Sequence, residues 1–223
     1  MINRKTIISG GLFIMPVEKF ADKTLKDFTA EVAAKEGKPG GGSVAGLTGA
    51  SAAALGIMVA NLTEGKKRYA EHEKEVLDAR DRLETLRTYL LYLVDEDIKA
   101  FAPLAKYSAM DKSDPTIANR YQEALRTACF IPNEIHYKMV EVAEALAVIA
   151  KYGCVGAISD VGSALAMCRS VMETCRFTTL ANAKYIKDEV YAETLRREFE
   201  ISFGEIMPVI DDALAVVEEK LAR

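Results

Sequence analysis

The chain has 223 residues, of which 50% are hydrophobic, and this is enough to bury the core of one domain. Its 29 lysines and arginines are outnumbered by 33 acidic residues, and the net charge of -4 provides no overall basic field that would hold nucleic acid. The four cysteines contain no CxxC pair and the two histidines lie far apart, which argues against a zinc-ligand spacing and a secreted disulfide framework and predicts a cytoplasmic protein.

Helical periodicity dominates the chain. After residue 20, apolar residues recur at spacings of three and four, and neither strand-like alternation nor a hairpin turn signal is present, so we expect an all-α fold. We interpret residues 1–19 as an N-terminal extension and residues 20–223 as a single-domain helical bundle. The expected helices, about six in number, cover residues 22–36, 43–63, 66–110, 115–151, 159–185 and 188–222.

Prolines mark several positions in these helices. Asp114 followed by Pro115 is a typical helix start, because the carboxylate caps free amides and proline needs no backbone partner in the first turn. Pro103, Pro132 and Pro208 fall inside three of the expected helices. Each removes a backbone donor and crowds the preceding turn, so each is expected to kink or break its helix.

The segment from Pro39 to Thr63 carries no charge, and about 20 apolar residues suffice to cross a bilayer. Much of this segment is glycine, alanine, serine and threonine, which contribute little transfer energy, and the other helices have charged faces. The composition therefore favours a buried helix in a bundle over a membrane span. Its small residues would let another helix approach closely, either inside the bundle or at a subunit interface.

Three consecutive glycines, Gly40 to Gly42, precede this helix. A phosphate loop would need a Lys-Ser or Lys-Thr pair inside the glycine frame, which is missing. The helix start nevertheless presents unpaired amides and the positive end of the helix dipole, and such an end accepts anions. A flexible entry into the helix explains the glycines equally well.

One carboxylate interrupts an apolar seam in the third long helix. Residues at intervals of seven are apolar except for one acid: Val76, Leu83, Leu90, Asp97 and Leu104. A buried carboxylate must meet a cation, accept hydrogen bonds or hold a proton, and each of these suits an acid–base catalyst. A structural ion pair or a solvent-facing end of the seam is the alternative. Asp95 and Glu96 point to other sides of the helix and are expected to be solvated.

Two further charged features are candidates. Lys67 belongs to the cluster "GKKRY" at the end of the uncharged helix, which could hold an anionic substrate tail or form an ordinary solvated face. Asp160 follows Ser159 at a helix start, where helix capping accounts for a carboxylate without any catalytic role.

The stretch "PGGGSVAGLTGASAAALGIMVANLTEGKKRY" resembles the signature of the formiminotransferase-cyclodeaminase C-terminal family, which includes stand-alone methenyltetrahydrofolate cyclohydrolases. The resemblance continues through "DEDIKAF", "QEALRTACFIP", "GCVGAISDVGSALA" and "ANAKYIKDEVYAETL", so it covers nearly the whole chain after residue 20. It implies an all-α homodimer that acts on reduced folates, with no metal and no cofactor beyond the tetrahydrofolate substrate. By position it implies Asp97 and Asp160 as catalytic carboxylates and the following substrate-binding residues: Gly40, Gly41, Gly42, Ser43, Lys67 and Asn182.

Three positions depart from the family pattern: Asn133 stands where leucine is usual, and Cys154 and Thr178 stand where asparagine is common. These departures affect which function the resemblance implies. The first candidate is hydrolysis of 5,10-methenyltetrahydrofolate to 10-formyltetrahydrofolate, with Asp97 as acid–base residue and Asp160 orienting or assisting it. The alternatives are a formiminotetrahydrofolate cyclodeaminase that releases ammonia, and a non-catalytic folate-binding or scaffold dimer.

Overall fold

The computed structural model describes residues 19–35 and 37–223, and within them the all-α prediction is confirmed. The predicted N-terminal extension, residues 1–19, lies outside the described residues except for Lys19. Six α-helices are assigned in chain order: α1 (Leu25–Val32), α2 (Gly41–Thr63), α3 (Glu73–Ser108), α4 (Pro115–Tyr152), α5 (Ile158–Ala183) and α6 (Glu189–Leu221). Three short 3-10 turns accompany them: η1 (Phe20–Asp22), η2 (Lys67–Tyr69) and η3 (Val155–Ala157).

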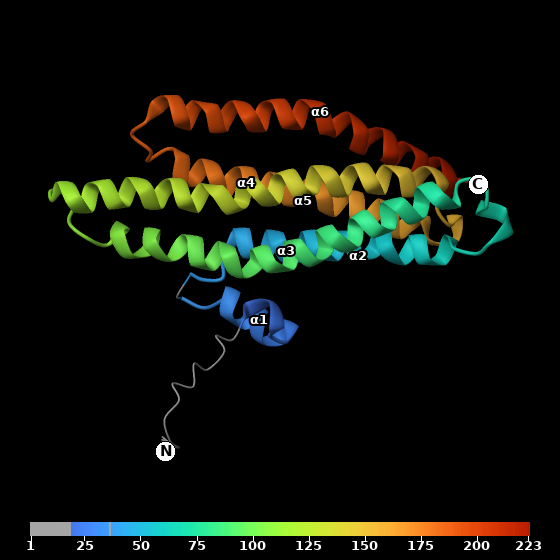
Figure 1. The fold of residues 1–223 in the computed structure, drawn as a ribbon, viewed down its shortest axis with the longest axis horizontal. Helices are drawn as coiled ribbons and strands as arrows, with labels where there is room; N and C mark the ends of the chain where they lie inside the picture. The colour runs from blue at the N-terminus through green and yellow to red at the C-terminus, as the bar shows by residue number, and fades with distance from the viewer. Residues whose placement is uncertain (1–18, 36) are drawn as a thin grey trace, which may run out of the picture.

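The long helices lie side by side and alternate in direction (Figure 1). The α2–α3 and α4–α5 connections meet at one end of the bundle, and the α3–α4 and α5–α6 connections lie at the other. Helix α2 packs against α3, α4 and α5, and α6 packs on α4 and α5. The short α1 lies outside the bundle, and the preceding turn η1 contacts α3. This alternation decides which residues can share a site, because residues near opposite ends of one helix are tens of ångströms apart.

The apolar seam predicted in α3 is confirmed. Val76, Leu83 and Leu90 are fully buried, and Asp97 on the same stripe is only 8% exposed. The prediction that small residues in α2 allow close packing is also confirmed. A Cβ on Gly49 would lie 2.6 Å from Met139 Sδ, and one on Gly56 would lie 2.6 Å from Leu146 Cδ2, so α3 and α4 occupy the space that side chains would need.

Helix α2 is long and apolar enough, by length and composition, to cross a membrane. However, 56% of its most apolar window is buried inside the protein, and the helix packs against three others. The core helix of a bundle can be equally long and apolar, and the packing of α2 against three helices supports a core helix over a membrane span. The uncharged sequence is thus explained by burial on most sides of α2.

Two local expectations need correction. Helices α3, α4 and α6 continue through Pro103, Pro132 and Pro208, so none of them is broken, and a kink at each proline stays a prediction. Asp95 is 9% exposed and not solvated. Its carboxylate accepts a 2.7 Å hydrogen bond from the backbone N–H of Phe20, so the preceding chain covers it and it anchors η1 to α3.

Candidate active site

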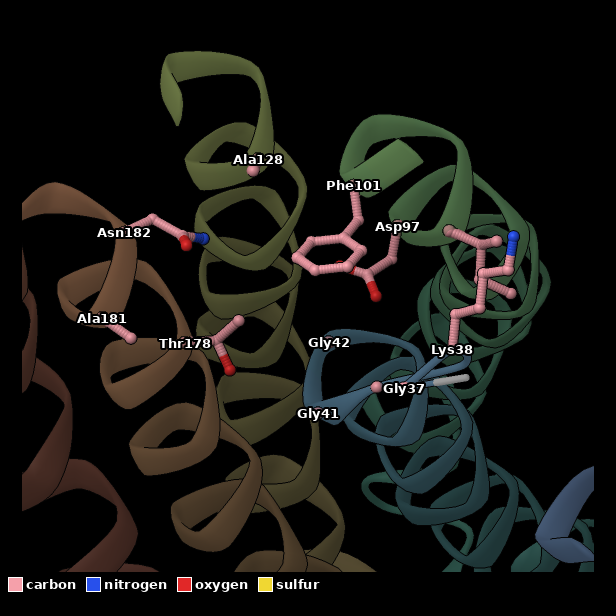
Figure 2. A pocket seen from close by; sticks show the side chains of 12 residues that line it. Gly37, Lys38, Gly41, Gly42, Asp97, Phe101, Ala128, Thr178, Ala181 and Asn182 are labelled. Atoms are coloured by element: carbon pink, nitrogen blue, oxygen red, sulfur yellow. The ribbon is translucent and has the colours of Figure 1, made fainter. Parts of the chain in front are cut away.

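A cavity of about 330 Å³ lies at the N-terminal end of α2, between α3, α4 and α5 (Figure 2). This volume is within the range that holds small organic ligands. Residues from four separate parts of the chain line it: Gly37, Lys38, Gly40, Gly41, Gly42, Asp97, Ile98, Phe101, Ala128, Thr178, Ala181 and Asn182. The cavity therefore exists only when the bundle is assembled.

Asp97 is the acidic group among the described residues that line the cavity. Its Oδ2 accepts a 2.8 Å hydrogen bond from Ser43 Oγ, and Ser43 is fully buried behind it. Burial raises the pKa of Asp97 above that of an ordinary aspartate, and hydrogen bonds from the Ser43 hydroxyl and backbone N–H counteract part of this rise. A carboxyl group with a raised pKa beside a cavity is suited to proton transfer.

Gly42 allows the carboxylate to reach the helix start. A Cβ at this position would lie 2.1 Å from Asp97 Oδ1, which is far inside van der Waals contact. Gly40, the N-cap residue of α2, has no side chain to cap the helix. Asp97 supplies a negative group to that end from a different helix, where the amides and the helix dipole favour it. The glycines thus leave room for the Asp97 carboxylate and also form part of the cavity wall.

The opposite wall comes from α5. Thr178 and Asn182 are one helical turn apart and both face the cavity (Figure 2). The Thr178 hydroxyl donates to the Thr174 carbonyl at 2.9 Å, so it presents a methyl group and an acceptor oxygen to the cavity. Sequence reasoning assigned no role at Phe101, although its spacing from Asp97, four residues along one helix, placed both on the same face.

The structure brings five of the eight predicted site residues to the cavity wall: Gly40, Gly41, Gly42, Asp97 and Asn182. Ser43 was predicted to bind substrate, and direct contact with substrate stays a prediction. The residue is fully buried and its hydroxyl donates to Asp97 Oδ2, so the role that this geometry supports is positioning of the carboxylate.

Asp160 and Lys67 do not join the cavity of their own chain. Asp160 lies in the first turn of α5, eighteen residues before Thr178, which corresponds to about 27 Å along the helix at 1.5 Å per residue. Lys67 begins η2, after the far end of α2. Both therefore lie near the opposite end of the bundle, and their roles at a site shared between subunits stay a prediction.

Of the three departures from the family pattern, Thr178 lines the cavity. Cys154 lies at the opposite end, where its N–H donates to Thr63 Oγ1 at 2.8 Å and Lys66 Nζ is 3.7 Å from its Sγ. Asn133 is half-buried in α4 and does not line the cavity. Within one chain, the change at residue 178 is thus the one of the three that can alter ligand contacts in this cavity directly.

Together, these features define an all-α protein with a buried carboxylate set against a glycine-lined small-molecule cavity. A family model described as formiminotransferase-cyclodeaminase matches residues 24–201, and the chain belongs to this family.

Individual relatives are similar over most of the chain. A methenyltetrahydrofolate cyclohydrolase of Methylorubrum extorquens is 33% identical over 80% of this chain and 88% of its own length. The formimidoyltransferase-cyclodeaminase of Rattus norvegicus is 29% identical over 81% of this chain, which spans 34% of the length of that larger protein. The crystal structure of a formiminotetrahydrofolate cyclodeaminase from Thermotoga maritima has a TM-score of 0.76 and 30% identity, covering 90% of this chain and 96% of the other.

Proposed function

We propose that this protein is a folate one-carbon enzyme that hydrolyses 5,10-methenyltetrahydrofolate to 10-formyltetrahydrofolate. The observation that carries the proposal is the buried Asp97 carboxyl group at the wall of a ligand-sized cavity. The similarity to a stand-alone cyclohydrolase over nearly its whole length supports this choice of reaction.

The chemistry requires a group that stabilises positive charge and moves protons. In methenyltetrahydrofolate a cationic carbon bridges two nitrogens, N5 and N10. Water attacks this carbon and Asp97 accepts one of the two water protons. The carbon–N5 bond then breaks as Asp97 delivers that proton to N5, and the remaining hydroxyl proton leaves to solvent as the formyl C=O bond forms. The formyl group stays on N10, and the net reaction releases one proton to solvent. This scheme uses no metal and no cofactor beyond the folate, and we place it in the cytoplasm.

A cyclodeaminase is the second candidate because the similar structure from Thermotoga maritima is that of a formiminotetrahydrofolate cyclodeaminase with the same fold. Ring closure of formiminotetrahydrofolate with loss of ammonia passes through a similar tetrahedral carbon, so the same carboxylate would serve it. Thr178, in place of the asparagine common in the family, changes a cavity contact and could shift the choice between the two substrates. A folate-binding scaffold without activity is the third candidate.

Parallel assays of the purified protein separate these candidates. We expect loss of methenyltetrahydrofolate absorbance at a rate well above the uncatalysed reaction, and little ammonia release from formiminotetrahydrofolate. Ammonia release with slow methenyl hydrolysis would replace the first candidate by the second. Folate binding in equilibrium dialysis, with turnover of neither substrate, would establish the scaffold function.

We also propose that the protein is a homodimer with an interface along α2. The outer side of this helix remains accessible and uncharged over its length, with Met58 39% and Leu62 43% exposed near its end and Ser51 and Ala54 exposed near its middle. An uncharged strip of this kind on a protein with many charged residues is typical of a surface that another subunit covers. Two-fold symmetry makes such an interface self-complementary.

Antiparallel pairing of two α2 helices would bring Lys67 and Asp160 of one subunit to the cavity of the other. The helix has 23 residues, or about 34 Å, and Thr63 at its far end contacts the α4–α5 connection through the Cys154 N–H. A second copy placed in this way would set its own Lys67 and Asp160 beside the first copy's helix start. Lys67 could then hold an anionic glutamate tail, and Asp160 could assist Asp97.

Subunit mixing tests this arrangement. Asp97→Asn and Asp160→Asn variants are each expected to be nearly inactive. Refolding them together should restore about a quarter of wild-type activity, because half of the dimers are mixed and each mixed dimer has one intact site of two. Sedimentation of the wild type should give a dimer. Full activity of the Asp160→Asn variant, or no recovery on mixing, would contradict the shared site.

A further inference from the structure

Phe101 is the one aromatic side chain among the described residues that line the cavity. It follows Asp97 by four residues on α3, so both side chains leave the helix on the same face. Figure 2 shows the ring extending from α3 beside the Asp97 carboxylate, toward the walls formed by α4 and α5. The ring is not part of the packed core, because Phe101 is 37% exposed.

The cavity would have apolar walls even without the aromatic ring of Phe101. Ile98, Ala128 and Ala181 already make the walls apolar. Lys38 is the one basic residue among the described residues that line the cavity, and its side chain points away from the space between α3 and α5 (Figure 2). A carboxylate and an aromatic ring therefore lie beside each other at the cavity wall (Figure 2), and carboxylates and ring faces both attract positive charge.

We propose that Phe101 is a specificity-determining residue, which stacks on the planar cationic ring of the substrate and selects it over uncharged folates. This inference rests on the proposed function, since it names the form of folate that the same cavity prefers. A ring face attracts a flat cation more strongly than a neutral group of the same shape, and the attraction increases where water is excluded. Asp97 and Phe101 then hold the cationic carbon between a proton acceptor and an aromatic surface.

The test compares two ligands and two substitutions. The ligands are 5,10-methenyltetrahydrofolate, which is cationic at the bridging carbon, and 5-formyltetrahydrofolate, which is uncharged there and is used as a competitive inhibitor. Phe101→Leu keeps an apolar side chain and removes the ring, whereas Phe101→Tyr keeps the ring. We expect Phe101→Leu to raise the KM for the cation about tenfold, with a change below about threefold in the inhibition constant of the neutral folate. Phe101→Tyr should restore a KM close to that of the wild type.

A matched control is available on α4. Phe130 is 64% exposed and does not line the cavity, so Phe130→Leu should change neither constant. If Phe101→Leu weakens the binding of both ligands equally, the ring makes only an ordinary apolar contact and the inference is overturned. A KM for the cation that does not change in Phe101→Leu, or that rises equally in Phe101→Tyr, would also overturn it.

If the wild type turns over neither substrate, the proposed function fails while the inference stays testable. Equilibrium binding of the same two folates to wild type and Phe101→Leu then gives the same comparison. A preference of the wild type for the cation that Phe101→Leu abolishes would support the inference, and equal affinities in the wild type would overturn it.

Discussion

Replacement of Asp97 by asparagine is expected to lower turnover of the folate substrate at least a hundredfold while the protein stays folded. A positioned acid–base group typically contributes about 10²–10⁴ to rate, and asparagine can neither accept nor return a proton. Ser43 Oγ, which donates to Asp97 Oδ2 at 2.8 Å, can still donate to the amide oxygen, so the local geometry should survive. The measurement is kcat with saturating substrate, together with a thermal unfolding curve.

The Asp97→Asn substitution should not lower the stability of the protein, although it lowers activity. The pKa of Asp97 is raised by burial, so the folded carboxyl group keeps its proton at a higher pH than the unfolded one does. Stability from this group is therefore present at low pH and is lost as pH rises from the unfolded pKa through the folded one. Asparagine does not ionise and removes this cost, so the Asp97→Asn variant should unfold at a temperature equal to or higher than that of the wild type at pH 7.

The pH profile gives a second measurement of the same residue. If the ionised carboxylate is the reacting form, kcat should fall on the acid side at a pH above that of an ordinary aspartate. The hydroxyl and N–H of Ser43 lower the pKa of Asp97, so Ser43→Ala should move this acid limb to higher pH. A profile that is unchanged in Ser43→Ala would contradict the assignment.

Asp95 provides a matched control for this experiment. It is a buried carboxylate on the same helix, two residues earlier, but it bonds to the backbone of Phe20 and does not line the cavity. Asp95→Asn should therefore retain kcat within about threefold, with at most a modest loss of stability near 1 kcal/mol. Equal loss of kcat in the Asp95 and Asp97 variants would indicate a structural role for both.

Replacement of Gly42 by alanine is expected to have the second largest effect. The new Cβ would lie 2.1 Å from Asp97 Oδ1 and 2.6 Å from Asp97 Cγ, so the carboxyl group must move away from the helix start and from Ser43. A displacement of about 1 Å in a reacting group can cost roughly a hundredfold in rate. We expect a loss of that order in kcat, together with about 1–3 kcal/mol of destabilisation from overpacking.

Gly204 on α6 is the control for the Gly42 substitution. A Cβ there meets nothing within 4 Å, so Gly204→Ala should leave kcat unchanged and stabilise the helix by about 0.5–1 kcal/mol. The decisive comparison is kcat of the two alanine variants at matched substrate saturation. A Gly42→Ala variant with normal kcat would mean that the carboxylate does not need its observed position.

Local sequence patterns predicted most of the fold. The bounds of α2, α4, α5 and α6 fall within a few residues of the prediction, because periodic apolar residues and caps act over one or two helical turns. Asp114 illustrates this, since its side chain accepts a 2.7 Å hydrogen bond from the Thr116 N–H, as expected of a helix cap. Helix α3 begins later than predicted, at Glu73, because η2 occupies the preceding residues.

The candidate site was predictable where its residues share a pattern with their neighbours. Asp97 is recognisable because it interrupts a seam of period seven, and Phe101 could have been recognised as its neighbour one turn later. Asp95 was misjudged because the chain segment that covers it, at Phe20, is 75 residues away in sequence. The hydrogen bond from the Ser43 hydroxyl to Asp97 was not predicted for a similar reason, since the carboxylate comes from another helix.

The sequence by itself determined that this protein is an all-α bundle with one uncharged helix and one acid in an apolar seam, because these properties follow from composition and from periodicity along single helices. The tertiary structure decided which side chains meet. The alternating directions of the helices bring Asp97, Phe101, Thr178 and Asn182 together around the start of α2, and leave Asp160 and Lys67 near the opposite end. That grouping depends on helix direction and on packing between distant segments, and no local pattern encodes either.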